Sequence, residues 1–237
     1  MTVSESERPL PDAAPPRESP RPSRWLLRLV TAFLVAAAAG GAYAVYAGVR
    51  LYSVIEGDAG FLTVPQDEFQ EAARRYENAG RVQGFAFALC AVVFLVWFSR
   101  MRRLTGQLAP DAFRRGPGWA VGAWFIPFAS LWMPYRIAMD MWAAASPLPD
   151  GGKPTRAPVW PVNLWWGLFV ANVTLGRYSA FRLDTAEDLF ALRDAVRQYL
   201  LCDTLEVLAA GAAVYFAFRL TALQERKAAQ GPFLSGV

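Results

Sequence analysis

Two carboxylic acids interrupt an otherwise apolar stretch near the end of the sequence. Asp203 and Glu206 lie in the run from Tyr199 to Leu220, and their spacing of three places them on one helical face. A carboxylate buried in an apolar medium is costly unless it is paired, neutralised or hydrated. Three interpretations follow: an apolar span that starts only near Val207 and leaves both acids in a polar layer before it, a structural ion pair, or an ion or ligand site.

Other catalytic chemistry has little support in the sequence. There is no histidine, which removes the commonest general base and metal ligand. Cys90 and Cys202 both lie in apolar runs, where inert packing is the expected role. No nucleophile elbow, phosphate-binding loop, dinucleotide fingerprint or metal-ligand spacing occurs. The sequence therefore predicts no catalytic residue, no metal and no cofactor, and a protein that is not an enzyme.

The apolar residues form long blocks rather than a scattered pattern. Hydrophobic residues make up 54% of the 237 residues and charged residues only 19%. Four blocks, residues 29–49, 82–98, 160–175 and 199–220, predict helices that span a membrane, which takes about 20 residues. The formal charge of +4 lies mostly between these blocks, which indicates membrane orientation rather than nucleic-acid binding. The predicted fold is an all-α, multi-pass helical bundle in the cell membrane.

The segments outside these blocks complete the predicted domain organisation. Residues 1–24 contain six prolines and predict a disordered cytoplasmic tail. Residues 25–227 form the membrane helical domain, and residues 228–237 form a flexible tail. Alanine and glycine at residues 36–41 give the first span a small face for close helix contact. The positions from Phe69 to Tyr76 predict a short amphipathic helix.

The number of spans depends on residues 119–145. Pro127 and Pro134 interrupt this segment, and proline breaks the hydrogen-bond ladder of a helix. If the segment turns back there are four spans, with 16 basic residues inside and 8 outside; a crossing gives five spans, with 14 and 10. The positive-inside rule favours four spans and cytoplasmic termini. Seven of nine tryptophans lie in residues 119–166, which also fits an interfacial or re-entrant element, while a kinked fifth span is the alternative.

Four spans bring several polar residues to one end of the bundle. In that arrangement Asp203 and Glu206 share the outer end with four polar side chains, Arg50, Arg81, Gln83 and Asn172. A polar cluster in the outer leaflet is therefore predicted. With five spans the two acids face the cytoplasm instead, away from Arg50.

A second group of residues suggests contact with the membrane surface. Arg136 and Asp140 lie four apart on one helical face, which fits either a solvated face or a contact with anionic lipid headgroups. Three tryptophans, Trp119, Trp132 and Trp142, are expected at the interface. The pair Gly118 and Gly122 forms a G-x-x-x-G, which is weak evidence for close helix packing or dimerisation.

The most distinctive motif covers residues 98–147. Its parts are an aromatic and arginines that close a span, a turn, a glycine- and tryptophan-rich core, a proline elbow and a later tryptophan pair. Here these are Phe98, Arg100, Arg102, Ala109-Pro110-Asp111, Gly118 to Pro127, Pro134-Tyr135, Trp142 and Trp165-Trp166.

Over residues 82–225 the sequence resembles a family of actinobacterial multi-pass membrane proteins, domain of unknown function 4328. The resemblance implies a membrane location and does not imply an activity. This chain departs from the family pattern at Ser99, Leu104 and Ser130, where family members often carry histidine or asparagine. An activity that needs those polar groups is therefore not expected here.

The function expected from these features is non-enzymatic. The sequence predicts a membrane interaction or scaffold protein that associates with lipids, with a membrane protein partner or with further copies of itself, and not with nucleic acid. The alternative is a permease for an ion or small solute that uses the acids of the last span.

Overall fold

The structure is a computed structural model that describes residues 22–56, 65–146, 157–184 and 189–230. These residues are all-α, as predicted. The helices are α1 (Arg24–Glu56), α2 (Gln66–Leu108), η2 (Pro110–Ala112), α3 (Trp119–Gly122), η3 (Ala129–Leu131), α4 (Met133–Ala145), α5 (Trp160–Asp184) and α6 (Leu189–Ala229). Most of the two predicted tails lies outside the described residues, although helix begins at Arg24 and α6 extends to Ala229.

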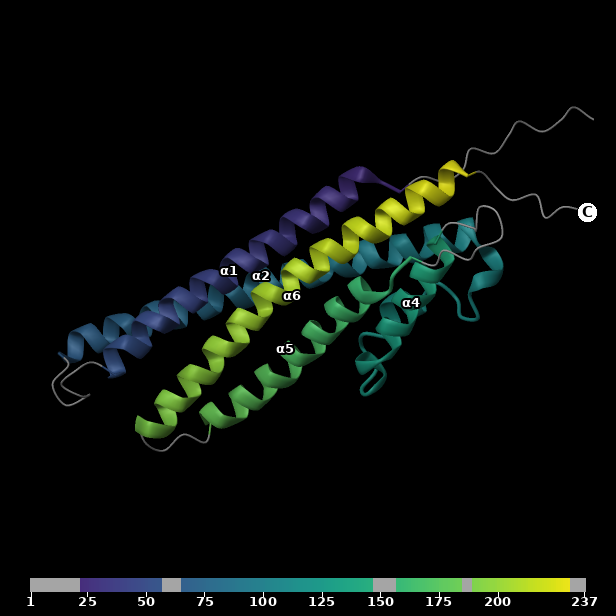
Figure 1. Ribbon diagram of the computed structural model, residues 1–237. Coiled ribbons are helices and arrows are strands. Elements are labelled where there is room, and N and C mark those ends of the chain that lie inside the picture. Colours follow the sequence, from purple (N-terminus) through teal and green to yellow (C-terminus); the bar gives the residue numbers. More distant parts are fainter. Residues whose placement is uncertain (1–21, 57–64, 147–156, 185–188, 231–237) are drawn as a thin grey trace, which may run out of the picture.

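Four long helices form the bundle, and α6 is its central member (Figure 1). Helix α6 packs against α1 on one side and α5 on the other, and α2 packs along α1. Helices α2 and α5 meet mainly where Trp165 of α5 packs against two phenylalanines of α2. The ring centroid of Trp165 lies 5.6 Å from that of Phe94 and 6.3 Å from that of Phe98. Away from this contact α2 and α5 leave space between them.

The start of α1 and the end of α6 lie at the same end of the bundle. Arg24 Nε lies 3.2 Å from Glu225 Oε1. The end of α2 reaches the same place, because Gln224 Nε2 donates to Thr105 Oγ1 at 2.7 Å. Lys227 Nζ donates to the carbonyl of Ala144 at the end of α4. The segment between α2 and α5 therefore begins and ends at one end of the bundle.

Residues 119–145 do not form a continuous helix. Helix α3 covers only four residues, and Phe128, directly after Pro127, has a φ of 61°. Helix resumes in α4, with Pro134 in its first turn, where a proline leaves no hydrogen bond unmade. The segment turns at Phe128, so it consists of short helical pieces rather than one long helix (Figure 1).

Among the described residues, three helices are long and apolar enough to cross a membrane: α1, α2 and the part of α6 from Arg193 to Ala229. They contain three of the four predicted spans. The fourth, in α5, is a 25-residue helix, but by composition it is not among these candidates. The prediction of a separate amphipathic helix at Phe69 to Tyr76 is wrong, because these residues form the first part of α2. No proline separates them from the apolar run that follows, and the helix continues through Gly80.

An aromatic core holds the helices together at the end of the bundle near α4. Trp165 of α5 stacks on Phe216 of α6, with ring centroids 4.5 Å apart and planes 3° apart. Trp97 of α2 meets the same phenylalanine edge to face, and Trp142 of α4 stacks on it. Phe216 therefore joins four helices in one cluster.

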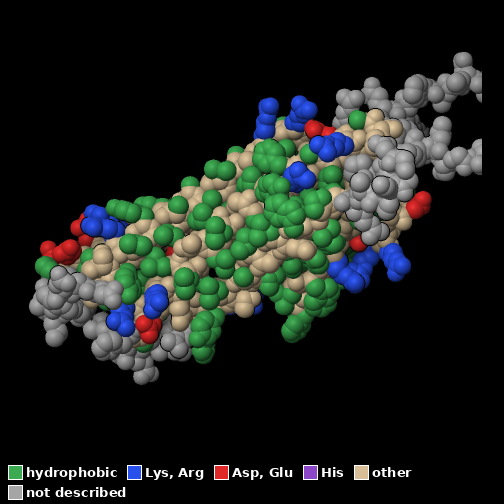
Figure 2. All heavy atoms as spheres, viewed as in Figure 1, with side chains coloured by type: hydrophobic (Ala, Val, Ile, Leu, Met, Phe, Trp, Pro, Cys, Tyr) green, Lys and Arg blue, Asp and Glu red, His purple; other side chains and the backbone are tan. Residues whose placement is uncertain are grey.

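Hydrophobic and charged side chains occupy different parts of the bundle surface (Figure 2). Figure 2 shows hydrophobic side chains along the middle of the visible face and charged side chains near its two ends. Large apolar side chains such as Phe85 (69% exposed) and Trp25 (66% exposed) face outward. A surface of this kind fits an apolar surrounding medium better than water.

Candidate functional site

The two acids of α6 are held by one glutamine of α2. Gln83 Nε2 donates to Asp203 Oδ1 at 2.9 Å and to Glu206 Oε2 at 2.7 Å. Asp203 is only 6% exposed, and both acids lie within the continuous helix α6. The amide nitrogen of Gln83 has two hydrogens, and each is directed to one carboxyl group.

The small face of α1 lets these residues meet. A Cβ atom added at Gly40 would lie 3.4 Å from the Cα of Gln83, and one at Gly41 would lie 3.1 Å from Val207 Cγ2 and 3.6 Å from the Asp203 carbonyl oxygen. Helix α1 therefore touches both α2 and α6 at the level of the site. The predicted role of residues 36–41 in close helix contact is confirmed at this glycine pair.

Replacing Gly41 by leucine is expected to destabilise the protein by about 1–3 kcal/mol, the usual cost of overpacking. The added side chain would have to occupy the space of Val207 and of the α6 backbone. Thermal unfolding in detergent measures the effect. Gly211→Leu is the matched control, because no atom of another described helix lies within 4 Å of a Cβ at Gly211. Equal melting temperatures for the two variants would contradict this account.

Each acid retains one carboxyl oxygen without a partner. Asp203 Oδ2 and Glu206 Oε1 are buried and form no hydrogen bond within the described part of the chain. No described arginine or lysine lies within ion-pair distance of either acid, although Arg177 lines the same cavity. The interpretation as a structural ion pair is therefore not supported by the described residues. Acceptors left buried in this way are costly unless a ligand, ion or water meets them.

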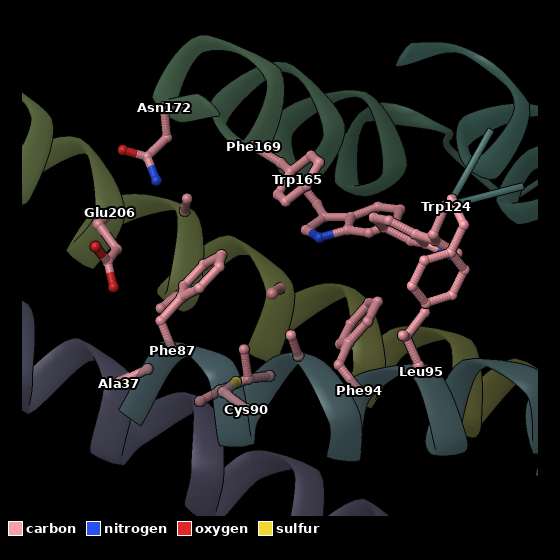
Figure 3. Close-up of a pocket in the computed structure, with 16 residues that line it drawn as sticks. Ala37, Phe87, Cys90, Phe94, Leu95, Trp124, Trp165, Phe169, Asn172 and Glu206 are labelled. Atoms are coloured by element: carbon pink, nitrogen blue, oxygen red, sulfur yellow. The ribbon is translucent and has the colours of Figure 1, made fainter. Parts of the chain in front are cut away.

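Two adjoining cavities separate α2 from α5. The polar cavity, of about 760 Å³, contains Gln83, Asp203 and Tyr76 in its wall. The apolar cavity, of about 260 Å³, runs from there past Phe94 to Trp124 and is shown in Figure 3. Phe87, Asn172 and Glu206 line both cavities. Together they form one groove, polar at one end and apolar at the other, called the α2–α5 groove below.

Figure 3 shows how the groove changes character along its length. Asn172 of α5 and Glu206 of α6 lie at one end, and Trp124 lies at the other, with Phe94 and Trp165 between them. Such a gradient suits a molecule with a polar head and an apolar chain, since pockets bind by apolar walls and a few placed polar groups. Asn172 thus lies near the acids, as predicted.

Arg50 and Arg81 do not join this cluster, and the prediction is wrong for these two residues. Arg81 is exposed and pairs with Glu77 one turn earlier on α2, at 2.6 Å. Arg50 is exposed and lines a separate cavity that also contains Glu68 and Glu71. Both arginines have nearby carboxylates on α2, and water or headgroups around them offset their charge at less cost than the groove.

The second predicted group, near α4, is only partly at the surface. Arg136 and Asp140 are exposed, and Trp119 and Trp132 are 40% and 49% exposed. Trp142, by contrast, is 1% exposed, so its predicted interfacial position is wrong. Its indole instead fills the space beside Phe216, and its Nε1 donates to the Ala157 carbonyl at 3.4 Å.

The surroundings of Asp140 are strongly basic. Partial burial raises the pKa of its carboxyl group, and the positive charges of Arg102 and Arg136, followed by those of Arg115 and Arg114, act against that rise. These five residues line one polar cavity of about 330 Å³.

The residues of the predicted motif serve the fold. Trp165 and Trp166 lie in the aromatic core, and Pro134 is buried at the start of α4. Pro127 is exposed at the turn before Phe128. The predicted packing of Gly118 and Gly122 is not found, since helix covers only residues 119–122 and no described atom lies within 4 Å of a Cβ at either glycine.

Comparison with known families identifies the motif. The family described as domain of unknown function 4328 matches residues 62–222. The chain belongs to this family. The family match begins before the stretch in which the sequence alone shows the resemblance, and it includes the first turns of α2. Comparison with curated proteins and with solved structures gives no match.

Within this DUF4328 chain the structure adds residues to the candidate sites. Arg102 and Arg115, which form the basic cavity with Arg136, are visible in the sequence only as motif or loop arginines. Gln83 is visible only as one polar residue at the start of an apolar run, and its role as a bridge depends on how α1 brings α2 to α6. Across the described residues no group of three or more histidine, cysteine, aspartate or glutamate side chains could hold a metal ion.

Proposed function

We propose that this DUF4328 protein is a multi-pass protein of the cell membrane that binds a lipid-like amphiphile in the α2–α5 groove and does not transform it. The observation that carries this proposal is the continuity of the two cavities through Asn172 and Glu206. The apolar half takes a chain, and the acids take a cationic or hydrogen-bond-donating head. The absence of histidine from the chain is consistent with binding rather than catalysis.

The distribution of charge supports a cytoplasmic position for the end of the bundle at which α1 begins and α6 ends. Among the side chains described, the end near Glu225 carries eleven basic and three acidic residues, and the opposite end, with Asp203 and Glu206 included, carries seven basic and seven acidic residues. The basic residues of the first end are Arg24, Arg28, Arg100, Arg102, Arg103, Arg114, Arg115, Arg136, Arg219, Arg226 and Lys227, and its acids are Asp111, Asp140 and Glu225. Basic residues are retained on the cytoplasmic side of membranes.

A reporter fused after Val237 is expected on the cytoplasmic side, as is a reporter fused before Met1. The contact between Arg24 and Glu225 places the two helix ends together, and the excess of basic charge orients them. Paired alkaline phosphatase and fluorescent protein fusions measure the side of each terminus. An active C-terminal phosphatase fusion, which requires export, would contradict the four-span arrangement.

In this arrangement the groove has the orientation of an outer-leaflet lipid. Gln83 lies at the start of the apolar run of α2, so the polar half of the groove lies near the outer headgroups. From Gln83 to Phe94 the helix rises about 16 Å at 1.5 Å per residue. The apolar half therefore extends into the hydrocarbon, in the direction of an acyl chain.

The groove predicts the chemistry of the head. Asp203 and Glu206 repel each other when both are ionised, and Gln83 supplies neutral donors only. A cationic ammonium group would attract both carboxylates and donate to the oxygens that lack partners. The same site would repel the head of a fatty acid.

Binding can be tested with brominated single-chain amphiphiles, since bromine quenches tryptophan fluorescence on contact. Brominated dodecylamine is expected to quench the full-length protein saturably, at least tenfold more tightly than brominated dodecanol or dodecanoate. Replacing Trp124 and Trp165 by phenylalanine should remove most of that quenching, because both line the apolar half.

The acids are tested with Asp203→Asn combined with Glu206→Gln. This variant is expected to weaken binding of the amine at least tenfold, a loss of about 1.4 kcal/mol. Glu68→Gln combined with Glu71→Gln is the matched control, since those acids line a different cavity of the same bundle. Equal quenching by all three headgroups, or no effect of the Asp203 and Glu206 changes, would reject the proposal.

A permease for a cation or small cationic solute is the second candidate. The position of Asp203, buried beside Glu206 within an apolar helix, favours it. Reconstituted liposomes should then show uptake of methylammonium that is lost in the same double variant. If the protein binds dodecylamine but takes up no methylammonium, the result would support the amphiphile-binding function and reject the permease.

A further inference from the structure

The basic cavity at the other end of the bundle is a site of a different kind. Four arginines from three elements line it: Arg102 of α2, Arg114 and Arg115 of the loop after η2, and Arg136 of α4. Asp140 is the one carboxylate among its lining residues. With a volume of about 330 Å³, the cavity is within the usual range for small-molecule sites.

Arg102 is fixed in this cavity rather than free to reach solvent. Arg102 is only 6% exposed, and its Nη2 donates to the carbonyl oxygen of Arg115 at 2.8 Å. The guanidinium carbon lies 3.4 Å from the ring centre of Phe113, a cation–π contact. A Cβ atom at Gly106 would lie 2.9 Å from Nη1, so glycine at this position leaves room for the guanidinium group.

The charge of the cavity is not balanced by the protein. None of the four arginines forms an ion pair within 4 Å among the described residues, and one carboxylate faces four positive charges. A buried guanidinium without a counter-charge is costly, and the cost falls when an anion occupies the site. Guanidinium groups present parallel N–H donors that match two oxygens of a phosphate.

The aromatic residues around the cavity favour a lipid as the source of that phosphate. Trp119 lines the cavity and is 40% exposed, with Arg115 lying 5.7 Å from its ring centre. Phe125 and Phe128, in the turn that follows, are 71% and 78% exposed. Exposed aromatic side chains beside arginines are typical of the level of lipid headgroups.

We infer that Arg102, Arg114, Arg115 and Arg136 form a binding site for a phosphate-bearing anion, the phosphate of an anionic phospholipid headgroup or of a soluble phosphate compound. This site is separate from the α2–α5 groove, and it uses opposite charge. Binding there does not depend on whether the groove binds an amphiphile.

Binding is tested on the full-length protein in detergent by native mass spectrometry and thermal unfolding. Dioleoyl phosphatidic acid, phosphatidylcholine and inorganic phosphate are the three probes. Phosphatidic acid is expected to bind at least tenfold more tightly than phosphatidylcholine and to raise the melting temperature. Saturable stabilisation by inorganic phosphate at an affinity equal to that of phosphatidic acid would assign the site to soluble phosphate compounds, and a weaker effect would assign it to lipids.

Arg136→Gln is the main variant, because Arg136 is exposed and its replacement is expected to leave the fold intact. It is expected to weaken phosphatidic acid binding at least tenfold, and Arg102→Gln is expected to do the same if it folds. Arg103→Gln is the matched control, since it removes the same charge from the next position of α2 but does not line the cavity. An equal loss in Arg103→Gln, or no preference for phosphatidic acid over phosphatidylcholine, would overturn the inference.

Discussion

Replacing Trp165 by alanine is expected to lower the free energy of unfolding by about 3 kcal/mol, the lower end of the range for tryptophan. Trp165 is 3% exposed and stacks on Phe216 while also touching Phe94. The lower end is expected because lipid replaces water around the proposed bundle, so the loss comes mainly from packing. Chemical denaturation in mixed micelles, followed by circular dichroism, measures the change.

Trp25→Ala is the control for that experiment. Trp25 is 66% exposed at the start of α1, so its loss should change the unfolding free energy by less than about 0.5 kcal/mol. If both variants lose the same stability, the aromatic core does not hold α2, α4, α5 and α6 together as the structure indicates.

Gln83→Leu is expected to destabilise the protein by about 3 kcal/mol, since each buried acceptor that loses its partner costs about 1–3 kcal/mol. Both Asp203 and Glu206 lose their donor in this variant. The loss should be largely recovered when Asp203 and Glu206 are also changed to leucine, because apolar groups then replace every member of the cluster. The melting temperature in detergent reports both effects.

Gln107→Leu controls for the change of a glutamine in α2 as such. Gln107 is exposed and contributes to neither candidate site, so its replacement should leave the melting temperature within about 1–2 °C. Failure of the triple leucine variant to regain stability would show that Gln83 acts through packing rather than through its two hydrogen bonds.

The sequence predicts those features of the fold that depend on local chemistry. Apolar blocks indicate the long helices, and Pro127 with Pro134 indicates the break between α2 and α5. The apolar run at residues 82–98 does not predict the length of α2, which extends from Gln66 to Leu108. Charged residues with good helix propensity continue the helix beyond both ends of the apolar run. Helix length outside an apolar run leaves no signal in hydropathy.

Contacts between distant residues account for most of the errors at the sites. Tryptophan is a residue type common at membrane interfaces, which is why an interfacial position is predicted for Trp142. The turn at residues 127–132 instead directs α4 so that the indole of Trp142 packs against Phe216. Arg50 and Arg81 lie at the correct end of the bundle but on outward faces. Which face of a helix meets a neighbour depends on the packing of α1 against α2 and α6, and a single sequence does not contain that rotation.

One consequence follows from the unbroken course of α2. Gln83 and Arg102 both lie on the continuous helix α2, about 28 Å apart along its axis at 1.5 Å per residue. No proline lies between them, and the one glycine between them, Gly84, is exposed. A tilt that widens the groove at Gln83 therefore also displaces the guanidinium group of Arg102 at the opposite end. Among the described helices, α2 alone contributes side chains to both the α2–α5 groove and the basic cavity, so it fixes the distance between the two candidate sites.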